Sequence, residues 1–278
     1  MSAVGFIGLG QIGAPMAAHL LDWPDGLVVY DVRPEATAPF SSKGAVVASS
    51  AAEVADRAEV VSLMVRDDDQ VREVCREIVA TSRSSVVVAV HSTIRPGTAE
   101  LLSDESAASG VDIVDAPVSG GFMGASEGSL AVMVGGEEEP VERCGPVFSC
   151  WASLIVHAGP AGAGTKAKLA RNLLTFAGYA AAAEAQRLAE AAGIDLGELA
   201  KVVRHSDRVT GGPGAIMLRD TTASMKPEDP LYEILSHTRE LGEKDLALAI
   251  DLGEELGVDL PFAKLALERL GQGLGLSS

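Results

Sequence analysis

The chain has 278 residues, of which 47% are hydrophobic and 22% charged, a length sufficient for one large or two modest domains and a composition typical of folded enzymes. Its formal net charge of −17 argues against nucleic acid or an anionic membrane as a partner, because both bind basic surfaces. No apolar run reaches the length of a membrane span and no basic leader is present, so we expect a cytoplasmic protein. The cysteines Cys75, Cys144 and Cys150 lack metal-ligand spacing, and we expect reduced thiols and no metal site.

Short β-branched runs alternate with helical runs through the first half of the chain, which is typical of a doubly wound parallel sheet. The second half reads as helical and begins with an Ala- and Leu-rich segment from Gly159 to Glu190. We therefore predict the α/β fold class, with a Rossmann-type domain at residues 1–158 followed by an all-α domain at 159–278. The predicted strands cover residues 3–7, 27–31, 46–47, 59–65, 84–90, 111–115, 130–134 and 153–156.

The first functional signal is a glycine pattern that directly follows the first predicted strand. Gly8, Gly10 and Gly13 form G-x-G-x-x-G. In that order, such glycines allow a tight turn, a close backbone approach to a pyrophosphate, and helix–strand packing. The amides of Gln11 and Ile12 then open a helix, and a helix N-terminus favours the charge of a diphosphate. The pattern indicates a dinucleotide cofactor.

The second predicted strand ends in an acid, Asp31, about 20 residues after the glycine pattern. A Rossmann fold has there the carboxylate that binds the adenosine ribose hydroxyls. This carboxylate would repel the 2′-phosphate of NADP, so we expect NAD. Arg33 leaves NADP possible, because an arginine at this place can accept that phosphate.

Polar residues also follow two later strands at the edge of the sheet where cofactors bind. Arg66 follows the strand at 59–65, and Ser92 and Thr93 follow the strand at 84–90, where either hydroxyl could face the nicotinamide half. His91 is open to a packed, an exposed or a functional interpretation.

A serine and two glycines follow the strand that ends at Asp115. The backbone N–H groups of Ser119, Gly120 and Gly121 could converge on an anion, as in a nest, and the serine hydroxyl adds a donor. We predict that this stretch receives a substrate carboxylate. A glycine-rich hairpin without a chemical role is the alternative.

Lys168 and Asn172 are four residues apart on the predicted long helix, so they project from the same face. A lysine beside an amide at the seam of two domains indicates a small-molecule site, whereas the alternative is a solvated first turn. Lys244, on a predicted helix at 232–256, has an alternative interpretation as a surface lysine paired with a nearby glutamate.

Four stretches, in order and spacing, resemble the β-hydroxyacid dehydrogenase family, relatives of 6-phosphogluconate dehydrogenase. They are GFIGLGQIGAPMAAHL, DAPVSGGFMGASEGSLAVMVGG, GAGTKAKLARN and EKDLALA, and together they extend over nearly the whole chain. The resemblance implies a Rossmann-type domain joined by a long helix to an all-helical domain. It also implies a homodimer or homotetramer that oxidises a small 3-hydroxy acid, or reduces its semialdehyde, with NAD or NADP.

The same resemblance implies roles for single residues. Lys168 would be the acid and base on the substrate hydroxyl, and desolvation would lower its pKa toward working pH. The implied substrate contacts are Ser119, Gly120, Gly121 and Asn172. Further implied cofactor contacts are Val65, Arg66, Gln70, Thr93 and Lys244.

One departure from the family pattern follows the lysine, where the usual Asn-Asn pair is Arg171-Asn172. An inward Arg171 would favour a substrate with a second anionic group, but it is about 300° around the helix from Lys168, so we expect it to face solvent. Two other functions compete: an imine-reductase-like NADPH-dependent reductase and a non-catalytic NAD(H)-binding sensor. Lys168 and the SGG motif at Ser119–Gly121 argue against the imine reductase, which typically lacks the lysine, and a sensor is expected to have lost Lys168.

Overall fold

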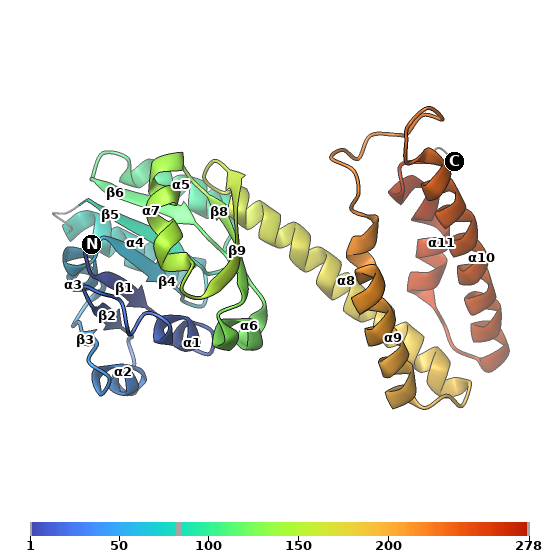
Figure 1. Cartoon of the computed structure of the whole chain (residues 1–278), viewed down its shortest axis with the longest axis horizontal. Coiled ribbons are helices and arrows are strands. Elements are labelled where there is room, and N and C mark those ends of the chain that lie inside the picture. The colour runs from blue at the N-terminus through green and yellow to red at the C-terminus, as the bar shows by residue number, and fades with distance from the viewer. Residues whose placement is uncertain (1, 82–84, 277–278) are drawn as a thin grey trace. The chain divides into compact units, whose positions relative to one another are not determined.

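The computed structural model describes residues 2–81 and 85–276 (Figure 1). The chain forms two compact units, Met1–Arg171 and Asn172–Ser278. The predicted division at 158/159 precedes the long helix, whereas the units part within it. Residue 84, with which one predicted strand begins, lies outside the described residues. Within the described ranges, no helix is both long and apolar enough to cross a membrane.

The first unit contains the predicted doubly wound sheet. Its strands are β1 (Val4–Ile7), β2 (Leu27–Tyr30), β3 (Val46–Val47), β4 (Val60–Leu63), β5 (Val86–Val90), β6 (Val111–Asp115), β7 (Val118–Ser119), β8 (Leu130–Gly135) and β9 (Ala152–Gly159). The order is β3-β2-β1-β4-β5-β6-β8-β7, and β9 pairs with β8. The strands from β3 to β6 in this order are parallel, while β8 runs antiparallel to β6 and β7. The chain order reverses at β1 and β4, which is where ligands bind in such sheets.

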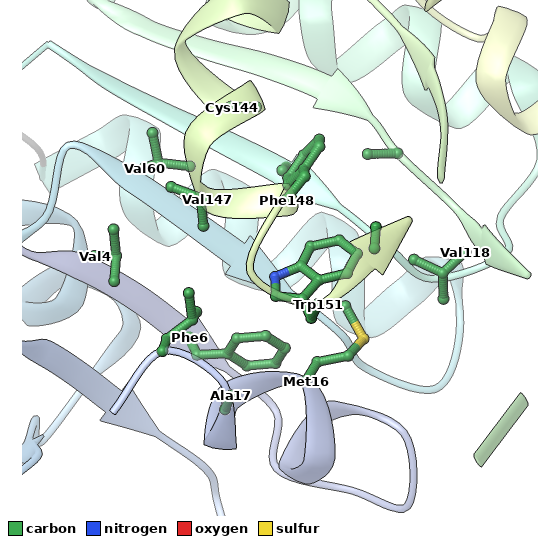
Figure 2. Packing of buried hydrophobic residues seen from close by; sticks show 14 of the residues in the cluster. Val4, Phe6, Met16, Ala17, Val60, Val118, Cys144, Val147, Phe148 and Trp151 are labelled. Atoms are coloured by element: carbon green, nitrogen blue, oxygen red, sulfur yellow. The ribbon is translucent and has the colours of Figure 1, made fainter. Parts of the chain in front are cut away.

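Helices in the first unit connect the strands. They are α1 (Gly13–Ala18), α2 (Pro34–Ser41), α3 (Ala51–Arg57), α4 (Asp68–Thr81), α5 (Pro96–Ser106), α6 (Gly121–Glu127) and α7 (Glu138–Phe148). Because helices cover both faces of a parallel sheet, its strands can be apolar throughout, and every residue of β1, β4 and β5 is buried. Figure 2 shows one side of this core, in which Trp151 lies among Phe6, Met16 and Phe148.

His91 belongs to this core, so the packed interpretation is correct. Its side chain is 1% exposed and meets Phe148 and Trp151 edge-on, with ring centroids 5.3 and 5.1 Å away. Nδ1 lies 2.8 Å from the Ala116 carbonyl oxygen, which can only accept, so Nδ1 carries the proton and Nε2 accepts from the Ser62 hydroxyl at 3.1 Å. Burial lowers the pKa of His91 to about 4 and keeps the ring neutral.

The second unit is helical, as predicted. The long helix α8 (Ala163–Ala191) leads into it, and α9 (Leu196–Thr210), a 3₁₀ turn η1 (Gly212–Ile216), α10 (Tyr232–Leu256) and α11 (Pro261–Gly273) follow. Asp195 caps α9 by accepting the Glu198 N–H at 2.9 Å. The buried Glu184 of α8 does the same for α11, accepting the N–H groups of Phe262 and Ala263 at 2.9 and 3.2 Å.

Candidate active site

A cleft of about 760 Å³ opens in the first unit beside β1 and β4. Its size falls within the range of cofactor sites. The cleft brings together all of the predicted cofactor residues except Thr93 and Lys244. Those that line it are Gly8, Gly10, Gln11, Ile12, Gly13, Asp31, Arg33, Val65, Arg66 and Gln70.

The three glycines of the turn meet three different constraints. Gly8 has a φ of 91°, and a Cβ there would collide with the Met64 carbonyl oxygen. A Cβ on Gly13 would collide with the Gly8 carbonyl oxygen, so this residue lets α1 pack on β1. A Cβ on Gly10 would meet nothing within 4 Å. The open space at Gly10 is a cradle into which a pyrophosphate fits against bare backbone.

The helix begins slightly later than predicted. Gln11 and Ile12 form a turn, and α1 starts at Gly13, with the Ala14 N–H donating to the Gly10 carbonyl oxygen at 2.9 Å. Since α1 has six residues, the turn itself, rather than a long helix dipole, provides most of the polar surface at this end of the cleft.

Asp31 occupies the end of β2 and makes two kinds of contact. One carboxylate oxygen accepts the Leu9 N–H at 2.7 Å, which ties the glycine turn to β2. The other accepts the Arg33 N–H at 2.9 Å and its Nε–H at 3.2 Å. Burial acts to raise the pKa of Asp31, but the hydrogen bonds from Arg33 and Leu9 outweigh it and lower the pKa below its ordinary value. The carboxylate is therefore ionised, and an exposed guanidinium is already held against it.

Met64, Val65 and Arg66, which follow β4, form the next part of the cleft wall. Ser92 is buried and joins the ends of β4 and β5, because its hydroxyl donates to the Val65 carbonyl oxygen at 2.7 Å and accepts the Val65 N–H at 2.9 Å. Thr93 is exposed and does not line the cleft. Gln70 orders the loop before α4 by accepting the Arg66 N–H at 3.0 Å.

Several cleft residues were missed by sequence reasoning. Tyr30 and Val32 flank Asp31, and α4 contributes Glu73, Val74 and Glu77. The signal for the α4 residues was available, because they lie three, four and seven positions after Gln70 and so share its helix face.

The predicted anion nest at Ser119–Gly121 lies where a short strand passes into a helix. Ser119 ends the short strand β7, and Gly121 begins the helix α6, which was not predicted. Gly120 and Gly121 have φ angles of 140° and 62°, and a Cβ on Gly120 would approach the Leu130 side chain to 2.8 Å. Both glycines are thus needed for the turn into α6. None of the three lines the cofactor cleft.

Lys168 lies on the first turns of α8 and is 9% exposed. Burial lowers the pKa of its amine below the usual value, and the cationic Arg171 lowers it further. Arg171 is exposed, as expected. However, an angle of 300° around a helix is 60° in the other direction, so the two side chains are neighbours and their charges interact.

The two remaining predicted residues belong to the second unit. Asn172 is partly buried on α8, one turn after Lys168. Lys244 is exposed on α10 and forms an ion pair with Asp245 at 3.1 Å, whereas its surface-lysine alternative had a glutamate as the partner. In the part of the chain that the structure describes, no three His, Cys, Asp or Glu side chains are grouped to hold a metal.

Family models match both halves of the chain. The model of the NAD binding domain of 6-phosphogluconate dehydrogenase matches residues 3–159, and that described as NAD-binding of NADP-dependent 3-hydroxyisobutyrate dehydrogenase matches residues 162–274. An uncharacterized oxidoreductase of Mycobacterium tuberculosis is 57% identical, over 98% of this chain and 93% of its own. A 3-hydroxyisobutyrate dehydrogenase of Pseudomonas aeruginosa is 34% identical, over 96% and 90%.

Solved structures agree with these matches. A protein of Mycobacterium avium 104 has 52% identity and a TM-score of 0.96, with all of both chains covered. The 3-hydroxyisobutyrate dehydrogenase of Mycobacterium tuberculosis, solved with L-serine, has 31% identity and a TM-score of 0.69, covering 100% of this chain and 96% of its own. An imine reductase of Myxococcus stipitatus has a TM-score of 0.77 at 17% identity, which shows a shared fold.

Proposed function

Because the chain belongs to the β-hydroxyacid dehydrogenase family, with NAD(P) as cofactor, we propose that it oxidises a small 3-hydroxy acid, or reduces the matching semialdehyde, with Lys168 as general acid and base. The observation that carries this proposal is the burial of Lys168, a lysine whose pKa is lowered and which lies on the helix that follows the cofactor-binding domain. Buried lysines with lowered pKa values are typical of catalytic acids and bases.

The proton transfers follow from the two states of the Lys168 amine. In the oxidation, the neutral amine takes the proton of the substrate hydroxyl. A bound nicotinamide would accept the hydride from the carbon that bears this hydroxyl. In the reduction, the ammonium returns the proton to the carbonyl oxygen. A lowered pKa raises the share of neutral amine near neutral pH, which favours the base role.

We propose that NAD is preferred over NADP. Asp31 is ionised and its lowered pKa keeps it so, and a 2′-phosphate would have to approach that charge. Arg33 is already engaged with Asp31 through both its backbone and its side chain. Use of NADP would need Arg33 to leave that ion pair.

We also propose contacts to the carboxylate of the substrate, to one further substrate oxygen and to the cofactor. Ser119, Gly120 and Gly121 would hold the carboxylate, Asn172 a substrate oxygen, and Lys244 the cofactor side. The names of relatives widen the set of acids to test: besides the 3-hydroxyisobutyrate dehydrogenases, one relative is an NAD-dependent L-serine dehydrogenase and another a 3-sulfolactaldehyde reductase.

A direct screen tests the proposal. The full chain is assayed with NAD and with NADP against 3-hydroxyisobutyrate, glycerate, L-serine and threonate, by the absorbance of the reduced nicotinamide. We expect turnover of at least one acid with NAD. Cyclic imines with NADPH form a second arm, in which turnover there and nowhere else would replace the proposal by an imine reductase. Tight NADH binding without any turnover would replace it by the sensor.

A further inference from the structure

The carboxylate of Asp115 lies at the end of β6, where the backbone is held from both sides. Asp115 pairs with Val90 of β5 and with Gly135 of β8, and it is 1% exposed. A buried carboxylate is costly unless its oxygens are hydrogen-bonded. Both carboxylate oxygens of Asp115 accept hydrogen bonds from outside the sheet.

Those partners are backbone amides at the start of α8. Oδ1 accepts the Gly162 N–H at 2.7 Å, and Oδ2 accepts the Thr165 N–H at 2.6 Å. The first N–H groups of a helix have no partner within it and are usually capped by a residue just before the helix. Here the cap comes from a strand far away in the sequence. The positive end of the 29-residue helix α8 favours the ionised carboxylate, while burial acts against it and raises the pKa of Asp115.

Two glycines allow the helix to start directly on the sheet. A Cβ on Gly164 would collide with the Met133 carbonyl oxygen, and a Cβ on Gly135 would collide with the Asp115 carboxylate. Gly164 and Lys168 are four residues apart, so they share a helix face. The face of α8 that touches β8 is therefore the face that carries Lys168.

We propose that Asp115 is a positioning residue for Lys168: its carboxylate fixes the first turn of α8 on the sheet, and the amine one turn later is held in one place as a result. The inference rests on the proposed function, since it gives Asp115 a role in catalysis only through Lys168. The rate of the catalysed step depends on such placement, because a displacement of a reacting group by about 1 Å can lower this rate on the order of 100-fold.

Glu184 provides a matched control, because it caps another helix in the same way. It is a buried carboxylate that accepts the first N–H groups of α11. If Asp115 were only a helix cap, Asp115→Asn and Glu184→Gln would have similar consequences. Positioning of Lys168 predicts that their effects on turnover differ.

The first test needs no substrate. Hydrogen exchange is followed on the full chain, as native protein and as Asp115→Asn. We expect slow exchange at Gly162 and Thr165 in the native protein, and exchange through residues 162–172 about tenfold faster or more in the variant. Fast exchange at these amides in the native protein, or no change in the variant, would overturn the proposal. If the variant does not fold, the native measurement still tests the two hydrogen bonds on which the proposal depends.

The second test separates kcat from KM, with the acid that turns over in the screen. Asp115→Asn should lower kcat by roughly 10- to 100-fold while KM for NAD stays within about twofold, and Glu184→Gln should leave both unchanged. An equal effect of the two variants would reduce Asp115 to a structural cap. Lys168→Gln is run beside them: if it retains full turnover, the proposed function fails, whatever Asp115 does.

Discussion

The ion pair between Asp31 and Arg33 is expected to determine the preference for NAD over NADP. Asp31→Asn removes the charge that a 2′-phosphate would meet and frees Arg33 to bind it. We expect the ratio of kcat/KM with NADP to that with NAD to rise roughly tenfold or more, because like charges in contact are strongly disfavoured. Glu139→Gln, a change of the same charge outside the cleft, is the control. An unchanged ratio would contradict the role given to Asp31.

His91 predicts a pH dependence of stability. Its pKa is about 4 in the folded protein and about 6.5 when unfolded, so between these values the unfolded chain binds a proton that the folded chain does not. The free energy of unfolding should therefore fall as pH drops from about 6.5 to about 4, by up to about 3 kcal/mol in total from this residue. Urea unfolding at several pH values tests this. His91→Asn should have a smaller slope in this window, and an identical slope would refute the assignment.

At the scale of the element, two glycines of the turn have different roles, one in stability and the other in cofactor binding. Gly13→Ala places a Cβ against the Gly8 carbonyl oxygen and should cost about 1–3 kcal/mol of stability. Gly10→Ala meets no protein atom, so its stability should stay near that of the native protein, while NADH affinity falls because the Cβ enters the space of the pyrophosphate. Urea unfolding and NADH titration of both variants test the pair. Loss of stability in Gly10→Ala would contradict this reading of the turn.

The glycine turn was also the part of the site most readable from sequence. The roles of Gly8, Gly10 and Gly13 depend on neighbours within one strand–turn–helix unit, so their spacing was enough. Asp115 depends on partners 47 and 50 positions away, and these are backbone amides, which leave no side-chain signal. Sequence reasoning recorded it only as the end of a strand.

The helix α6 was not predicted from the sequence either, because its formation depends on packing. The stretch that forms α6 is predicted as an anion nest or a glycine-rich hairpin, because four of the ten residues from Ser119 to Gly128 are glycine and glycine disfavours helices. In the structure α6 packs on α1 and on β8, with the Leu130 side chain against Gly120 and Gly124, and packing commonly overrides propensity. The doubly wound sheet itself followed from the β-branched runs, since strands buried on both faces need no alternation.

At the scale of the whole molecule, the second unit exposes a large apolar surface. The helix α9 has no buried residue in this single chain, and three of its exposed residues are apolar: Val202, Val203 and Val209. Phe176 and Tyr179 of α8 stack edge-on at 5.9 Å and are also largely exposed. Large exposed apolar patches are typical of protein interfaces. We therefore propose that a second copy of the chain covers these helices.

Light scattering after gel filtration tests this assembly. We expect a mass at least twice the 28.6 kDa of one chain, and Val203→Glu should shift it toward the monomer. The exposed Leu154→Glu, on β9 of the first unit, is the control and should leave the mass unchanged. A native protein that is monomeric at all concentrations would contradict the prediction.

The most direct test of the central claim compares native protein with Lys168→Gln on the same hydroxy acid. We predict that kcat falls by about 10²- to 10⁴-fold, the range of a lost general acid or base, while NADH binds to both proteins with the same affinity. That result would assign the proton transfer to Lys168. Full turnover by the variant would show that another group moves the proton, and the mechanism proposed for this chain would be wrong.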